Sequence, residues 1–229
     1  MSEHIPNLNI FNGTVRRRAA NAPVLWALLL LILPVVSVST ASASEAVQRL
    51  VILGDSLTAG YGLSEKEAFP ARLEAHLKAL GHAVEVEGAG VSGDTTAGGL
   101  ARLDWSIGAD ADAVIVELGG NDALRGLSPA LTEENLRQIV ERLRARGLPV
   151  LLAGMWAPPN MGRDYADAFN AVFASVAAEY EVPLYPFFLE GVAADPRLNQ
   201  ADMIHPNAAG VEIIVERIAP YVIALLQSG

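Results

Sequence analysis

Three side chains of this 229-residue chain, a serine, an aspartate and a histidine, have neighbours suited to nucleophilic chemistry. Ser56 directly follows Gly54 and Asp55, and an apolar run over residues 50–53 precedes them. A buried strand that ends in Gly-Asp presents the next side chain at the edge where open α/β sheets bind ligands. Ser56 is therefore a candidate nucleophile. The alternative is an ordinary helix cap after a strand, a common use of aspartate and serine.

The candidate base is His205, and the candidate acid that orients it is Asp202. A carboxylate three positions before a histidine in a loop can bind one imidazole nitrogen, which leaves the other nitrogen to accept the serine proton. His76 and His82 fall in a predicted helix and in a turn, away from the expected ligand-binding edge. The alternatives are a histidine that caps or packs before a proline and a solvated loop aspartate.

Three groups can donate hydrogen bonds to an oxygen that gains negative charge during such a reaction. The side-chain amide of Asn121 follows a Gly-Gly pair at the end of a predicted strand, where asparagine otherwise forms a turn. The backbone N–H groups of Gly93 and Ser56 are the other two candidate donors. The neighbouring aspartates are interpreted as supports that cap loops or bind backbone amides: Asp55, Asp94 and Asp122.

Short apolar runs alternate with longer segments of helical period after the first 43 residues, a pattern typical of a parallel sheet with helices on its faces. The fold class predicted is therefore α/β, with five strands at residues 49–53, 83–88, 113–118, 150–153 and 182–185. All loops that follow the strands of a parallel sheet lie at one edge. The candidate groups are therefore expected to gather there although they are far apart in the sequence.

Apolar residues at three- and four-residue steps predict the helices between these strands. One helix carries Phe69, Leu73, Leu77 and Leu80 on one face, and another spans about residues 96–105. Thr132 is the predicted cap of the next helix. The last two helices bury apolar faces within residues 169–180 and 211–222. Two prolines in the loop 155–162 argue against a helix or a strand there.

The first 43 residues have the layout of a secretory signal peptide. Three arginines at 16–18 precede an apolar run over 24–36, and small residues follow at 41–43. A helix that spans a bilayer needs about 20 apolar residues, and this run is shorter and contains Pro34. We expect cleavage after Ala43 and a location in the periplasm or outside the cell, with 44–229 as one domain. Retention as an anchor is the alternative, and the arginines also suggest twin-arginine export.

Composition excludes several classes of function. The chain is 52% hydrophobic and 18% charged, as core-forming globular proteins are. It contains no cysteine, which excludes disulfides, a thiol nucleophile and thiolate metal sites. Removal of residues 1–43 takes away three arginines and one glutamate, so the net charge changes from −10 to −12. Nucleic acid is therefore excluded as an expected partner, and we expect a monomer.

Four ordered blocks of this sequence resemble those of the SGNH (GDSL) hydrolase family: Gly54-Asp55-Ser56-Leu57, Ser92-Gly93-Asp94-Thr95, Gly120-Asn121-Asp122 and Asp202-Met203-Ile204-His205-Pro206. The resemblance covers nearly all of residues 49–226 and extends to the exported bacterial branch with arylesterases and a thioesterase/lysophospholipase. It implies a three-layer α/β/α fold with a flavodoxin-like sheet and no metal or organic cofactor. Ser56 is then the nucleophile, His205 the base and Asp202 its partner.

The same resemblance implies that Ser56, Gly93 and Asn121 form the oxyanion hole. Two residues depart from the pattern of the branch, since Met203 and Ala123 stand where glycine is usual. Each of them adds bulk beside the site, and neither removes a reacting group. The two departures are therefore expected to affect substrate preference more than activity.

The loop after the fourth predicted strand resembles the substrate-side loop of the branch, and we expect Trp156, Pro158, Pro159 and Met161 to contact substrate. Apolar side chains suit an acyl chain better than a sugar. The alternative is that Trp156 and Met161 pack the loop onto the core. The predicted function is hydrolysis of short- to medium-chain acyl esters, with thioesters and lysophospholipids as further candidates.

Other functions remain alternatives at this point. A carbohydrate O-acetylesterase would use the same residues, and a secreted binding protein would keep the fold without catalysis. An α/β-hydrolase also orders its triad as serine, acid and histidine, but the chain has no Gly-x-Ser-x-Gly elbow. A receiver-like regulator would fit the sheet but not the signal segment.

Overall fold

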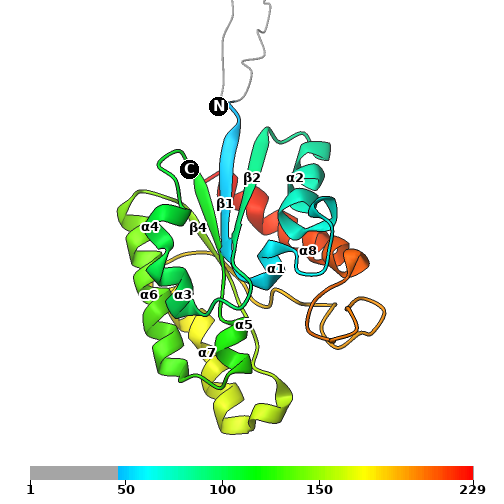
Figure 1. Cartoon of the computed structure of the whole chain (residues 1–229). Coiled ribbons are helices and arrows are strands. Elements are labelled where there is room, and N and C mark those ends of the chain that lie inside the picture. The colour runs from blue at the N-terminus through cyan, green and yellow to red at the C-terminus, as the bar shows by residue number, and fades with distance from the viewer. Residues whose placement is uncertain (1–45, 229) are drawn as a thin grey trace, which may run out of the picture. The chain divides into compact units, whose positions relative to one another are not determined.

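Five strands form one parallel sheet in the computed structural model, which describes residues 46–228 (Figure 1). The strands are β1 (Gln48–Gly54), β2 (Val84–Gly90), β3 (Ala113–Glu117), β4 (Val150–Ala153) and β5 (Leu184–Tyr185). Their order across the sheet is β2-β1-β3-β4-β5. The predicted α/β class and five parallel strands are confirmed. The predicted signal peptide and its cleavage after Ala43 lie outside the described residues.

Helices cover both faces of the sheet and complete the three layers. Figure 1 shows α2 and α8 on one side and α3, α4, α6 and α7 on the other. The longer helices are α2 (Phe69–Ala79), α6 (Pro129–Ala145), α7 (Arg163–Glu179) and α8 (Ala208–Leu226). The shorter ones are α1 (Ser56–Ala59), η1 (Glu65–Glu67), α3 (Thr96–Ala101), α4 (Leu103–Ser106), α5 (Gly120–Leu124) and η2 (Pro159–Met161). No helix of the described residues is long and apolar enough to cross a bilayer.

The core lies on both faces of the central strands. Every residue of β3 and β4 is buried, which explains why these strands are continuous apolar runs, apart from Glu117 at the end of β3. The predicted apolar face of α6 is also buried, with Leu136, Ile139 and Val140 among its members. Burial of an aliphatic side chain contributes about 1.5–3 kcal/mol, so this core holds the strand ends in register.

The start of α6 differs from the prediction. Thr132 is not its cap, because the helix begins one turn earlier, at Pro129, with Ser128 as the N-cap residue. Proline suits the first turn of a helix, where its missing N–H has no partner to lose. Thr132 lies inside the helix, fully buried, and its hydroxyl donates to Asp122 at 3.2 Å.

Three further details differ from the sequence expectation. The helix predicted over 96–105 is broken into α3 and α4 at Arg102, whose guanidinium turns inward to bind backbone carbonyls. Helix α2 ends at Ala79, so Leu80 leaves the buried face and is 56% exposed. The loop 155–162 contains the single 3-10 turn η2, which begins at Pro159.

The register of the strands aligns the three strand ends that precede the candidate groups. Gly54 at the end of β1 pairs with Gly90 of β2 and with Glu117 of β3. The segments that follow these three ends carry Ser56, Gly93 and Asn121. Parallel pairing therefore brings groups that are far apart in the sequence to the carboxyl edge of the sheet.

Candidate active site

Ser56 is held at the carboxyl end of β1 by a tight turn into a short helix. Asp55 is the N-cap of α1, and its Oδ1 accepts a hydrogen bond from the backbone N–H of Leu57 at 3.0 Å. A side chain at Gly54 would collide with Thr58 and Glu117, so this position needs a glycine. Ser56 is the first residue of α1 and is 9% exposed. The turn thus presents its hydroxyl at the sheet edge.

The three predicted reacting side chains form a continuous hydrogen-bonded line. Ser56 Oγ lies 2.9 Å from His205 Nε2, and His205 Nδ1 lies 2.7 Å from Asp202 Oδ2. Asp202 Oδ1 also accepts from the backbone N–H groups of Ile204 and His205, each at 3.0 Å. The hydrogen bond from the His205 ring and those from the two backbone groups lower the pKa of Asp202 to about 2. An ionised carboxylate therefore faces Nδ1, the arrangement that leaves Nε2 free to accept the serine proton.

An aromatic ring that the sequence did not single out covers the imidazole. The ring centroid of Tyr61 lies 4.5 Å from that of His205, with the planes tilted by 34°. Tyr61 follows the glycine that ends α1, and Gln200 Nε2 donates to its backbone carbonyl at 2.7 Å. This hydrogen bond ties the Ser56 turn to the loop that carries His205.

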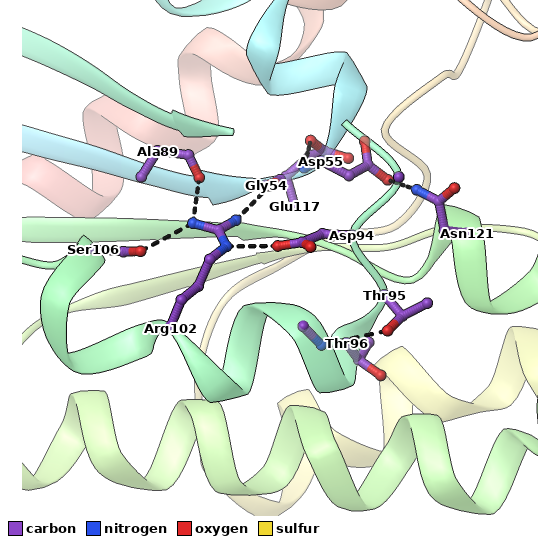
Figure 2. A network of polar contacts seen from close by, with 12 residues as sticks. Gly54, Asp55, Ala89, Asp94, Thr95, Thr96, Arg102, Ser106, Glu117 and Asn121 are labelled. Carbon is purple, nitrogen blue, oxygen red and sulfur yellow. Dashed lines mark hydrogen bonds and ion pairs between the residues drawn. The ribbon is translucent and has the colours of Figure 1, made fainter. Parts of the chain in front are cut away.

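Asn121 lies on α5, directly after a glycine pair. Gly119 has a φ of +114°, a conformation that turns the chain sharply at the end of β3. Asn121 Nδ2 donates to Asp55 Oδ2 at 2.9 Å, which occupies one amide hydrogen and leaves the other available (Figure 2). The amide is therefore fixed beside the residue that precedes the candidate nucleophile.

The two backbone candidates for the oxyanion hole differ in their surroundings. In residues 46–228, neither the Gly93 N–H nor the Ser56 N–H donates to another group of the chain. Gly93 adopts a φ of +85°, and its carbonyl accepts from Arg125 Nη2 at 2.7 Å. Gly93 is not among the residues that line the cavity described below, whereas Ser56 and Asn121 are.

A buried arginine joins the strand ends beneath the site (Figure 2). Arg102 is 7% exposed. Its guanidinium donates to Gly54 O at 2.7 Å, Ala89 O at 2.9 Å, Ser106 Oγ at 3.0 Å and Asp94 Oδ2 at 2.6 Å. One side chain thus links the ends of β1 and β2 to the loop that carries Gly93. Nothing in the sequence pattern distinguished it from a surface arginine.

The predicted supporting role of the neighbouring aspartates agrees with the contacts. Asp94 pairs with Arg102, and Asp55 caps α1. Asp122 accepts from the Thr96 N–H at 2.9 Å and from its hydroxyl at 2.5 Å. Because Asp122 is 1% exposed, these hydrogen bonds fasten the start of α3 to α5 without competition from water.

Glu117, the last residue of β3, is fully buried beneath the Ser56 turn. Its Oε2 accepts from the Thr58 hydroxyl at 2.7 Å, while Oε1 has no partner among the described residues. Burial and the nearby Asp55 carboxylate raise the pKa of Glu117 well above its usual range. Burial likewise raises the pKa of Asp55 to about 6. A glutamate at the end of an apolar strand was the available sequence signal for this buried pair.

One cavity of about 820 Å³ is lined in part by Ser56, Asn121 and His205. Apolar residues from four segments form most of its wall: Leu124, Met155, Trp156, Ala157, Pro158, Pro159, Phe187, Leu189, Ala193, Ala194, Met203 and Ile204. Trp156 stacks on Phe187 with centroids 4.4 Å apart and planes 1° from parallel, and it remains 55% exposed. Such a cavity can hold an apolar acyl group next to a few convergent polar groups.

Only some of the four predicted substrate-loop residues lie at the cavity. Trp156, Pro158 and Pro159 line the cavity, and Met161 does not. The η2 turn carries Met161 towards Gly126, where a Cβ would lie 3.0 Å from its Cε. Met161 therefore packs against the segment between α5 and α6, and a substrate contact is not supported for it. The part of the chain that the structure describes has no group of three acidic, histidine or cysteine residues placed to hold a metal ion.

Comparison with known proteins identifies the family of this chain. The profile of the GDSL-like lipase/acylhydrolase family matches residues 52–213, more than half of the chain. The chain belongs to this family. The resemblance to SGNH (GDSL) hydrolases is thereby confirmed, and the GDSL protein described here is a carboxylic ester hydrolase.

Individual relatives of this GDSL protein support the assignment. It is 43% identical to esterase TesA of Pseudomonas aeruginosa over 182 residues, 79% of this chain and 90% of the relative. It is 42% identical to thioesterase 1/protease 1/lysophospholipase L1 of Escherichia coli K12 over 177 residues, 77% of this chain and 84% of the relative. The crystal structure of the esterase EstA from Pseudoalteromonas, inhibited by monoethylphosphonate, superposes with a TM-score of 0.74 at 30% identity, over 79% of this chain and 99% of that one.

Proposed function

We propose that this GDSL hydrolase cleaves short- to medium-chain carboxylic esters through an acyl-serine intermediate. The observation that carries the proposal is the unbroken line from Ser56 through His205 to Asp202, with distances of 2.9 and 2.7 Å, at the floor of a largely apolar cavity. A serine hydroxyl is a weak nucleophile by itself. An adjacent base that is oriented by a carboxylate makes it reactive.

In the first half of the reaction, Ser56 Oγ attacks the ester carbonyl carbon while His205 Nε2 takes its proton. Asp202 stabilises the imidazolium that results. The carbonyl oxygen gains negative charge and is bound by the backbone N–H groups of Ser56 and Gly93 and by the free amide hydrogen of Asn121. His205 then returns the proton to the leaving alcohol, and the acyl group stays on Ser56.

In the second half, water takes the place of the alcohol. His205 removes a proton from the water as it attacks the acyl-serine carbonyl, and the same three donors bind the oxygen again. Collapse of this intermediate releases the carboxylic acid and returns the proton to Ser56. Only groups of the chain and water take part in these steps.

The substrate range follows from the shape and chemistry of the cavity. Its apolar walls favour acyl chains of several carbons over sugars, and its volume of about 820 Å³ lies within the range of pockets that bind small molecules. Relatives named thioesterase, lysophospholipase and esterase suggest thioesters and lysophospholipids as further substrates. On the basis of residues 16–43, we propose that the enzyme acts in the periplasm or outside the cell.

The assignment is tested with p-nitrophenyl acetate, butyrate, octanoate and palmitate. Ser56→Ala should abolish turnover of all four, and a fluorophosphonate probe should label the wild type but not this variant. Ser175→Ala is the matched control, because Ser175 lies exposed on α7 and its hydroxyl contacts only Glu133. Turnover or labelling that survives in Ser56→Ala would exclude Ser56 as the nucleophile, and a rate maximum at palmitate would contradict the proposed chain length.

A further inference from the structure

The backbone at Met203, between the proposed acid and base, adopts a conformation that suits glycine. Its φ is +59°, in the left-handed region that residues with a Cβ avoid. The Met203 N–H donates to Gln200 O at 3.0 Å, and Asp202 caps the two N–H groups that follow. The turn needs this backbone conformation, and glycine would provide it with less strain. The methionine side chain must therefore be explained by what it contacts.

Packing in the core does not explain it, because Met203 is 44% exposed. Its side chain lines the cavity, next to Ile204 and His205. Three residues other than glycine have positive φ among residues 46–228, namely Glu181, Ala194 and Met203. Ala194 and Met203 both line this cavity, and Glu181 does not. Unfavourable backbone conformations of this kind cluster at active sites and ligand-binding sites.

The position of His205 indicates which part of a substrate would reach Met203. The imidazole Nε2 takes the serine proton and hands it to the leaving oxygen, so the alcohol must lie on the His205 side of the ester carbon. The carbonyl oxygen points to the donors near Asn121 instead. Met203 adjoins His205 in the same wall, and its flexible, polarisable thioether makes favourable contacts with aromatic rings.

We propose that Met203 is a specificity-determining residue that contacts the alcohol portion of the ester and favours bulky apolar or aromatic alcohols. The inference rests on the proposed ester hydrolysis at Ser56 and adds a leaving-group preference to it. The strained backbone at position 203 is then the consequence of placing a large apolar side chain at the point of the loop that faces the departing alcohol.

The test compares benzyl and ethyl butyrate, which share an acyl group and have alcohols of similar acidity. The ratio of kcat/KM for benzyl over ethyl ester should fall about 10-fold in Met203→Gly, since one apolar contact changes such ratios by about 10- to 200-fold. Met203→Leu should keep a ratio close to that of the wild type. Glu181→Gly is the matched control, because it removes a positive-φ side chain away from the cavity and should leave the ratio unchanged.

Two further measurements separate specificity from structure. The Tm of Met203→Gly should equal or exceed that of the wild type, because glycine relieves the backbone strain and the lost side chain is outside the core. The ratio of benzyl hexanoate to benzyl acetate should stay constant, because it reports on the acyl side.

Several outcomes would overturn the inference. They are an unchanged benzyl-to-ethyl ratio, a change confined to the acyl series, or a Tm several degrees lower in Met203→Gly. A wild type that hydrolyses neither butyrate would overturn the proposed function itself, and the inference with it. Wild-type activity with an unchanged ratio in Met203→Gly would overturn the inference alone.

Discussion

The contact between Asp55 and Asn121 gives a quantitative prediction about the proposed oxyanion hole. Asn121 Nδ2 donates to Asp55 Oδ2 at 2.9 Å, and Asp55 is only 2% exposed, so water does not compete for this hydrogen bond. A hydrogen bond to a charged group contributes about 1.5–3 kcal/mol. Loss of one oxyanion donor raises a barrier by about 2.7–4 kcal/mol. The Asp55 contact should therefore account for a large part of what Asn121 contributes.

A double-mutant cycle measures that share. Asn121→Ala alone should lower kcat by about 10²- to 10³-fold. Asp55→Ala should also lower kcat, because it frees the Asn121 amide and removes the cap at Leu57. In the Asn121→Ala background only the cap remains to be lost. The coupling energy should thus be about 1.5–3 kcal/mol, so Asp55→Ala should cost about 10- to 150-fold less in that background.

The assay is turnover of p-nitrophenyl butyrate at about pH 8, where Asp55, with its pKa of about 6, is ionised. Thermal unfolding of all variants checks that each is folded. Asp104 provides the control cycle, because its side chain is 80% exposed on α4 and faces Arg142 at 3.8 Å. Asp104→Ala should show no coupling with Asn121→Ala. If the Asp55 and Asn121 effects add to within about 0.5 kcal/mol, the carboxylate does not act through the amide and the reasoning is refuted.

Two further predictions concern the other carboxylates of the site. Glu117→Gln should flatten the pH dependence of stability. The pKa of Glu117 in the folded state lies well above its ordinary value of 4.5, so the unfolding free energy of the wild type falls as the pH rises above 4.5. The variant lacks this contribution of Glu117. Tm values at acid and alkaline pH measure it, and parallel slopes would contradict the buried acid. Asp202→Asn should lower kcat by about 10²- to 10⁴-fold with little change in Tm, because an amide cannot stabilise the imidazolium. The lower end of this range allows for the 38% exposure of the Asp202 side chain. A variant whose kcat exceeds a tenth of the wild-type value would argue against the role of Asp202.

Much of the fold was predictable because local sequence patterns indicate where its strands and helices form. Apolar runs bounded by glycine, proline and aspartate placed every strand to within two residues, and the alternation of strands with helices required a parallel sheet. The error at Thr132 shows where local rules compete. Threonine is a good cap, but Pro129 fits the first turn of a helix, and the Thr132 hydroxyl gains a buried acceptor in Asp122.

The candidate site was predictable in its reacting groups and in its supporting aspartates, but not in its other supports. Ser56, His205 and Asp202 each stand in a short local pattern, so their types and order could be read before any coordinates. Arg102 stands in no such pattern and Glu117 is marked only by its place at the end of an apolar strand. The roles of both depend on contacts that reach across up to 62 residues of sequence. Met161 is the converse case, since its type suits the cavity wall while the η2 turn places it outside the residues that line the cavity.

The sequence by itself determined the class of fold, the edge of the sheet where the site forms and the side chains able to react there. These properties depend on periodicity and on the direction of parallel strands, which are local or topological. The tertiary structure alone decided that Asp55 binds Asn121, that Arg102 joins two strand ends and that Met203 faces the cavity in a left-handed conformation. Such facts depend on side-chain direction and on distances of a few ångströms, and those exist only once the whole core has packed.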